Sequence, residues 1–124
     1  MKLPDTPAFD APDAARNLAD MSDAEFDRLP YGVVEMDHAM TVRRYNATES
    51  CYSGLPPSRV LGRHFFREVA PCSDNRHVAG RYRQDSLDET LDYTFSLRMR
   101  PVPVKLRMLK PAEGELMYLL VQWA

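Results

Sequence analysis

The sequence predicts an α+β domain, in which a five-stranded antiparallel sheet carries short helices on one face and a helical cap at its N-terminus. Apolar residues follow a helical spacing near the N-terminus, and two short strand patterns come next. A stretch rich in Pro and Gly then separates these from three longer strand patterns. The length of 124 residues suits a single domain. Within it, we expect residues 1–28 to form the cap and residues 29–124 the core.

The expected cap contains two short helices. Ala14, Leu18 and Met21 recur at helical spacing and make one apolar stripe. Ser22 and Glu25 have the spacing of a capping box, which predicts the start of the second helix. Because the stripe is narrow, we expect it to hold the cap only weakly on the core.

A hairpin and a group of short helices are expected next. Residues 31–36 predict a strand, and residues 41–45 predict the returning strand after a tight turn. Residues 46–85 are interrupted by Gly and Pro, so any helix there should be short. The better helix candidates lie at 58–61 and 75–85.

The last third of the chain has the clearest pattern. Apolar and polar residues alternate over 91–99, which is typical of a half-buried strand. We expect a turn at 100–103 and a second alternating strand at 104–108, in which Arg107 faces away from the core. Residues 116–123 form a third strand, apolar enough to be central.

Composition excludes several classes of protein. Apolar residues make up 44% and charged residues 27% of the chain, with a net charge of −2 and no basic cluster, so a nucleic-acid partner is not expected. No apolar run approaches the roughly 18–20 residues that span a bilayer, and the first residues lack an apolar leader core, so we expect a cytoplasmic protein without a membrane partner. Cys51 and Cys72 are widely spaced and the three histidines are scattered, so neither a disulfide scaffold nor a metal site is expected.

Tyr45 and Glu49 are the first candidate pair for a site. Four residues apart, they would lie on one face of a helical turn. A phenol beside a carboxyl that burial keeps protonated can hold an oxyanion with two hydrogen bonds. On spacing alone, an exposed glutamate that caps or pairs locally is the commoner arrangement.

Cys72 is the second candidate. It follows Pro71 and precedes residues that can cap a helix, a position that favours a thiolate. A buried cysteine that serves as a small hydrophobe is the commoner case. An enzyme with Cys72 as nucleophile lacks local support, because no histidine neighbours it.

Several segments, including those that contain Tyr45, Glu49 and Cys72, resemble photoactive yellow proteins, a family of blue-light receptors with a PAS-like fold. Residues 65–74 (FFREVAPCSD) are similar to the family's chromophore-attachment segment, and residues 45–49 (YNATE) to its phenolate-binding segment. Residues 93–99 resemble its third strand, and residues 17–21 and 29–32 its cap and first strand. The resemblance runs nearly end to end, and its motifs stand at the family's separations.

The resemblance implies a p-coumaric acid (4-hydroxycinnamic acid) chromophore, joined by a thioester to Cys72, whose backbone N–H would bind the thioester carbonyl. Tyr45 and Glu49 would hold the phenolate oxygen, and Ser53 would support the tyrosine. The other pocket residues that it implies are Phe65, Phe66, Val69, Ala70, Phe95 and Met99. Signalling would proceed by isomerisation, proton transfer from Glu49 and partial opening of the cap, toward a downstream protein that the sequence does not name. No enzymatic activity is implied.

The sequence departs from the family pattern at four places. Leu55 stands where many members have an arginine, and Leu97 replaces a common aromatic residue. Cys51 is an additional thiol, and the stretch between Gly80 and Tyr93 is shorter than in familiar members. These departures bear on the spectrum and the recovery rate, and they touch neither the attachment site nor the phenolate pair. The alternative interpretation is a PAS-type module that binds another small ligand, or none, without a covalent bond.

Overall fold

The computed structural model describes residues 7–97 and 100–123, and its centre is one antiparallel sheet with the strand order β2-β1-β5-β4-β3. The strands are β1 (Gly32–Asp37), β2 (Val42–Tyr45), β3 (Leu87–Leu97), β4 (Arg100–Lys110) and β5 (Leu116–Trp123). The α-helices are α1 (Ala14–Asp20), α2 (Asp23–Asp27) and α3 (Ala47–Ser53). The remaining helical turns are 3₁₀ turns at Pro57–Arg59, Pro71–Ser73 and Ala79–Arg83 and a π turn at Phe65–Val69. The expected five-stranded antiparallel sheet with short helices is confirmed.

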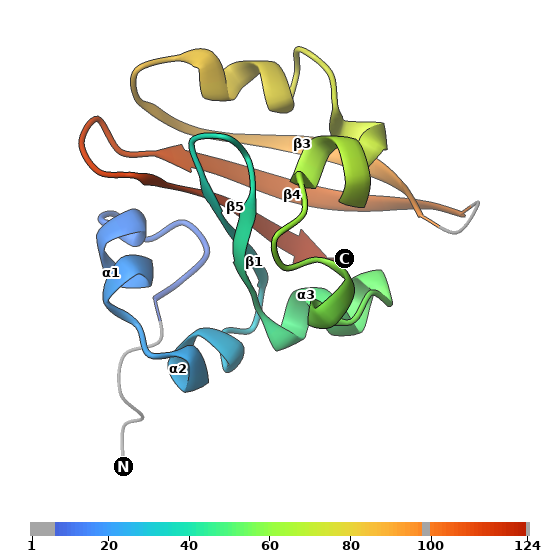
Figure 1. Cartoon of the computed structure of the whole chain (residues 1–124), viewed down its shortest axis with the longest axis horizontal. Coiled ribbons are helices and arrows are strands. Elements are labelled where there is room, and N and C mark those ends of the chain that lie inside the picture. The colour runs from blue at the N-terminus through green and yellow to red at the C-terminus, as the bar shows by residue number, and fades with distance from the viewer. Residues whose placement is uncertain (1–6, 98–99, 124) are drawn as a thin grey trace.

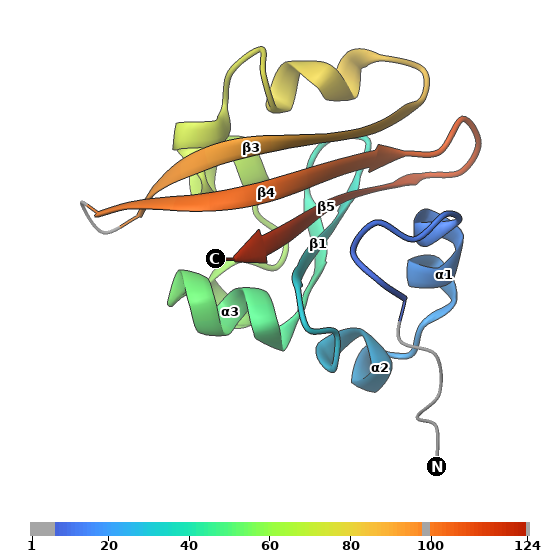
Figure 2. The ribbon, with the colours of Figure 1, turned by 180° about the vertical axis from the view of Figure 1, so that it is seen from behind.

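Both faces of the sheet are covered. Neighbouring residues of β1 belong to different apolar clusters, since successive side chains of a strand point to opposite faces. Val34 belongs to the cluster that includes residues of the short helical turns, whereas Val33 belongs to the cluster of the N-terminal segment. Figures 1 and 2 show the blue helices α1 and α2 beside β1 and β5, and the yellow turns alongside β3.

The apolar cluster that contains Val33 also contains residues of the two short helices that the sequence predicts near the N-terminus. Ala14 and Leu18 of α1 are buried, as their helical spacing requires. The capping box of α2 is present, with the Ser22 hydroxyl accepting from Glu25 N and the Glu25 carboxylate accepting from Ser22 N. Phe26 of α2 is buried as well.

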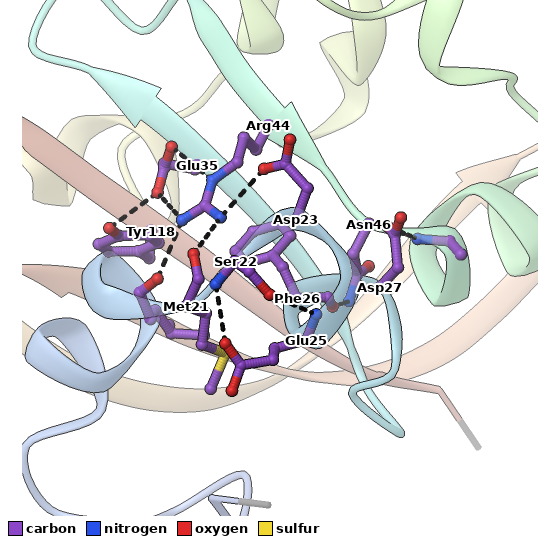
Figure 3. A network of polar contacts seen from close by, with 12 residues as sticks. Met21, Ser22, Asp23, Glu25, Phe26, Asp27, Glu35, Arg44, Asn46 and Tyr118 are labelled. Atoms are coloured by element: carbon purple, nitrogen blue, oxygen red, sulfur yellow. Dashed lines mark hydrogen bonds and ion pairs between the residues drawn. The ribbon is translucent and has the colours of Figure 1, made fainter.

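Arg44 of β2 holds the cap by polar contacts in addition to the apolar stripe (Figure 3). Its guanidinium makes a two-point pair with Glu35 of β1, at 3.0 and 2.7 Å. The same group donates to the backbone oxygens of Leu18 and Met21, at 2.9 and 3.0 Å, and lies 4.1 Å over the Phe26 ring. These contacts tie both helices of the cap to the edge of the sheet.

Arg107 corrects one expectation. The alternation of β4 predicted that this side chain faces away from the core toward solvent, yet it is only 5% exposed. Its guanidinium pairs with Asp88 at 2.9 Å and donates to the backbone oxygens of Phe9 and Ala11. The strand pattern gave its face correctly, but the N-terminal segment covers that face.

The predicted turn at 100–103 is also wrong. These residues begin β4 and pair with β3, from Leu97↔Arg100 to Thr94↔Pro103. Among the described residues, the pairing of β4 with β5 starts at Val104↔Trp123, so Pro101 and Pro103 have a described strand partner on one side. Proline is tolerated there because a missing N–H on the unpaired side costs no ladder bond.

The predicted helices of the middle segment are shorter in the structure. The candidate at 58–61 is a 3₁₀ turn at Pro57–Arg59, and the candidate at 75–85 contains a single 3₁₀ turn at Ala79–Arg83. Within residues 7–97 and 100–123, no helix is both long and apolar enough to cross a bilayer.

Candidate functional site

Asn46 fixes the turn of chain that carries Tyr45 and Glu49. It is fully buried and caps α3, with its Oδ1 accepting from the backbone N–H of Glu49 at 3.0 Å. The same oxygen accepts from Val33 N at 2.9 Å, and its amide nitrogen donates to the backbone oxygens of Phe26 and Tyr31. Asn46 therefore joins the end of α2, β1 and α3 at one point. Figure 3 shows Asn46 together with Phe26 of α2.

Glu49 is buried in the third position of α3, with only 3% of its surface exposed. Its Oε1 accepts a hydrogen bond from the indole Nε1 of Trp123 at 2.8 Å. Burial penalises the charged form and raises the pKa of Glu49 to about 7, while the Trp123 hydrogen bond opposes this rise. Near neutral pH the carboxyl can thus hold a proton or release it.

Tyr45 ends β2 and is buried. Its hydroxyl lies 2.7 Å from the hydroxyl of Ser53, which also accepts from Leu55 N at 3.1 Å. Burial, together with the nearby Glu49 carboxyl, raises the pKa of Tyr45, so the phenol stays protonated and able to donate.

The two polar groups share one small apolar pocket. Its cavity volume is only about 10 Å³, far below the roughly 300–1,000 Å³ of usual small-molecule sites, so its walls nearly close on one another in this structure. The residues that line it are Tyr45, Glu49, Ser53, Leu55, Phe65, Val69, Ala70 and Phe95. The structure thus brings together seven of the ten residues that the resemblance implies, and adds Leu55.

Cys72 is a free thiol in the 3₁₀ turn that follows the pocket residue Ala70. It is half-buried and packs against the main core, but it is not among the pocket-lining residues in the described part of the chain. Its backbone oxygen accepts from the hydroxyl of Tyr93 at 2.7 Å and from the amide of Asn75 at 3.3 Å. Two side chains thus fix this turn beside the pocket.

Two further expected pocket residues lie elsewhere. Phe66 is buried but does not line the pocket, and it packs edge-on against Phe65, with ring centroids 5.1 Å apart. Met99 lies outside the described residues. Cys51 is exposed on α3. Among the described residues, no group of three His, Cys, Asp or Glu side chains is arranged to hold a metal ion.

Sequence reasoning missed two polar residues of the site. Asn46 has a recognisable signal, since an Asn three residues before a Glu is a capping pattern. Trp123 has none, because its partner Glu49 lies 74 residues away along the chain and only the folded sheet brings them together.

Comparison with known proteins agrees with this geometry. A family model described as a PAS fold matches residues 26–122. A photoactive yellow protein from Rhodothalassium salexigens is 33% identical, over 92% of this chain and 94% of its own length. The chain belongs to the photoactive yellow protein family. A second relative of this name, from Halochromatium salexigens, is 34% identical over 82% of this chain and 85% of its own length.

Solved structures support the same family. The photoactive yellow protein domain from the sensor histidine kinase Ppr of Rhodospirillum centenum has a TM-score of 0.80 and 38% identity, over 86% of this chain and 97% of that domain. A PAS domain of an HTR-like protein from Haloarcula marismortui, with a TM-score of 0.65 and 19% identity over 90% of this chain and 98% of its own, shares the fold alone. The photoactive yellow proteins are photoreceptors rather than enzymes, so this chain is a PAS-fold photoreceptor of that family.

Proposed function

We propose that the chain is a blue-light photoreceptor that carries p-coumaric acid as a thioester on Cys72, with Tyr45 and Glu49 at the phenolate end. One observation carries this proposal: a protonated phenol and a buried carboxyl with a raised pKa line the same small apolar pocket. The wall of that pocket includes Val69 and Ala70, which lead directly into the Cys72 turn. A small, flat aromatic ligand with one acidic oxygen suits the chemistry of these walls, which must move apart to admit it.

The residues fit such a ligand in chemical type. Phe65 and Phe95 supply aromatic walls, and the Tyr45 hydroxyl, held by Ser53, supplies a donor. When bound, p-coumaric acid supplies a double bond that light isomerises and a phenolate oxygen that accepts a proton. Glu49 holds that proton in the dark and releases it after isomerisation.

Loss of the proton leaves a carboxylate in an apolar site. A buried charge without compensation costs several kcal/mol, whereas the whole domain is stable by about 5–15 kcal/mol. Residues 1–28, proposed as the cap, are then the part released, in a shift of population between two states. The signal passes to a second protein, which we expect to recognise the opened form. The cytoplasmic location stays a prediction of the sequence.

One observation favours a second candidate, a PAS-type sensor that binds a small ligand without a covalent bond. Cys72 is not among the pocket-lining residues that the structure describes, whereas Tyr45 and Glu49 are. A ligand held by the pocket alone would not need the thiol.

Reconstitution with activated p-coumaric acid separates the two candidates. The purified chain should acquire a red-shifted absorption band that bleaches in light, and the chromophore should stay attached to the chain through denaturation and gel filtration. Cys72→Ala should abolish this band, and Cys51→Ala, which removes the other free thiol, should keep it. A band that persists in Cys72→Ala would favour the non-covalent sensor, and the absence of any band in the unmodified chain would overturn both the thioester and the chromophore.

A further inference from the structure

Trp123 is fixed on three sides at the end of β5. Its Nε1 donates to Glu49 Oε1 at 2.8 Å, and its ring stacks on Tyr52, with centroids 5.4 Å apart and planes 7° apart. A third contact is the ring of Phe95, a pocket wall, at 5.7 Å. Figures 1 and 2 both show the C-terminal end of β5 beside α3, the helix that carries Glu49.

We propose that Trp123 is a positioning residue that sets how readily Glu49 gives up its proton, by donating its indole N–H to the carboxyl. The proposal rests on the proposed function for the role of that proton, and the family resemblance assigns no role to Trp123. An indole N–H can only donate, and such a bond is stronger to a carboxylate than to a neutral carboxyl. The contact therefore favours the ionised form.

Trp123 is the neighbour of Glu49 that favours the ionised carboxyl. Among residues 7–97 and 100–123, its indole is the one side chain with a hydrogen bond to the Glu49 carboxyl. Tyr45 is the titratable neighbour across the pocket, and its hydroxyl is engaged with Ser53. The other walls are apolar side chains and the backbone of β1.

The contact has a consequence for the lifetime of the signal. Once Glu49 has lost its proton, the indole N–H lowers the cost of the buried carboxylate. Without that N–H, the carboxyl takes its proton back sooner. Trp123 would therefore prolong the opened state, and its removal would shorten it.

The direct test is a pH titration of the Glu49 carboxyl in the full chain without chromophore. Infrared spectroscopy of protein with isotope-labelled glutamate monitors the protonation of the carboxyl. Trp123→Phe keeps an aromatic ring and removes the N–H, so the pKa of Glu49 should rise by about one unit, a tenfold change in the proton equilibrium. Tyr52→Leu is the matched control, because it removes the stacking partner and keeps the N–H. An unchanged pKa in Trp123→Phe, or an equal shift in Tyr52→Leu, would overturn the proposal.

A second measurement needs no variant of Trp123. The chain has one tryptophan, so its fluorescence reports this site alone. The emission should change with pH at the midpoint of the Glu49 carboxyl, and Glu49→Gln should make it flat. A pH-independent emission in the unmodified chain, or an unchanged titration in Glu49→Gln, would contradict the contact.

These tests use protein without chromophore, so their outcome is separate from that of reconstitution. If the band fails to form but the Glu49 titration responds to Trp123→Phe, the photoreceptor proposal fails and the contact stands. In loaded protein, Trp123→Phe should recover in the dark at least several times faster than Tyr52→Leu. Equal recovery of the two variants would contradict the role of the indole N–H in the lifetime of the signal.

Discussion

Gly32 lies directly beneath the carboxyl of Glu49, so close that a Cβ at position 32 would stand 1.9 Å from Glu49 Oε1. Gly32 pairs with Val121 in the sheet, two residues before Trp123. The Glu49 carboxyl therefore lies over the backbone of Gly32, where no side chain intervenes, and reaches the Trp123 indole from there. A side chain at this position of β1 would close that path. Residue 32 is thus part of the site without supplying any chemistry to it.

Gly32→Ala should therefore displace the Glu49 side chain and destabilise the fold by about 1–3 kcal/mol, the usual cost of overpacking. Denaturant unfolding measures this change. Gly80→Ala is the matched control, because a Cβ there meets its nearest atoms at an ordinary 3.5 Å. In a Glu49→Ala background most of the cost of Gly32→Ala should vanish, and purely additive effects would show that the clash lies elsewhere.

The stability of the chain without chromophore should depend on pH through Glu49. Its folded pKa is raised from 4.5 to about 7, so the unfolded chain loses this proton first as the pH rises. The contribution of Glu49 to the free energy of unfolding is fully present below about pH 4.5. It is lost as the pH rises to about 7, and the loss is about 3 kcal/mol in total. Glu49→Gln should remove this part of the slope in denaturant titrations at several pH values. An identical slope in the variant would contradict the raised pKa.

Asn46→Ala should be among the most damaging single changes in the chain. It would leave the N–H groups of Val33 and Glu49 and the carbonyl groups of Phe26 and Tyr31 without their present partner. Buried groups of this kind cost about 1–3 kcal/mol each when left unpaired, although water can reach some of them. We expect a loss of at least about 3 kcal/mol in unfolding experiments.

Asn17→Ala serves as the comparison for that change, because Asn17 lies on an exposed position of α1. It should alter stability by less than about 0.5 kcal/mol. Equal effects of the two alanine variants would mean that Asn46 is not the joint between cap and core.

Arg44→Ala should loosen the cap and expose it to protease. The variant leaves the buried Glu35 without its charged partner and removes two donors from the backbone oxygens of the cap. Because breaking a buried ion pair costs about 3–5 kcal/mol, we expect a loss of this size in the free energy of unfolding. Trypsin should then cut faster after Arg16 and Arg28, as followed by mass spectrometry. Arg43→Ala, which removes an exposed neighbour, should leave the cutting rate unchanged.

Much of the fold is predictable from local pattern, because strand alternation and capping residues act over a few positions. The period of two in β3 and the capping box of α2 were read correctly for this reason. The burial of Arg107 was not predictable, because alternation assigns a side chain to a face and does not say which segment covers that face. Pro101 and Pro103 led to the prediction of a turn, because proline usually interrupts a strand. That β4 pairs at these residues with β3 is apparent only in the assembled sheet.

The candidate site divides in the same way. Tyr45 and Glu49 were predicted as a pair on one helical turn, and the pocket of the folded chain contains both. The predicted turn is wrong, however, because Tyr45 ends β2 and only Glu49 lies in α3. Gly32 and Trp123 reach Glu49 from strands that are distant in sequence, so no window of the sequence links them. What the sequence could not supply is the set of groups around the carboxyl, which determines its proton affinity.

The proton of Glu49 is the centre of this account, and a light-minus-dark infrared spectrum of the chromophore-loaded chain tests it most directly. In the unmodified protein, light should remove the band of a protonated carboxyl, and trypsin should cut the cap faster under illumination than in the dark. In Glu49→Gln, that band should be absent and the light-induced increase in cutting small. A carboxyl band unaffected by light, or an equal opening of the cap in Glu49→Gln, would contradict the account.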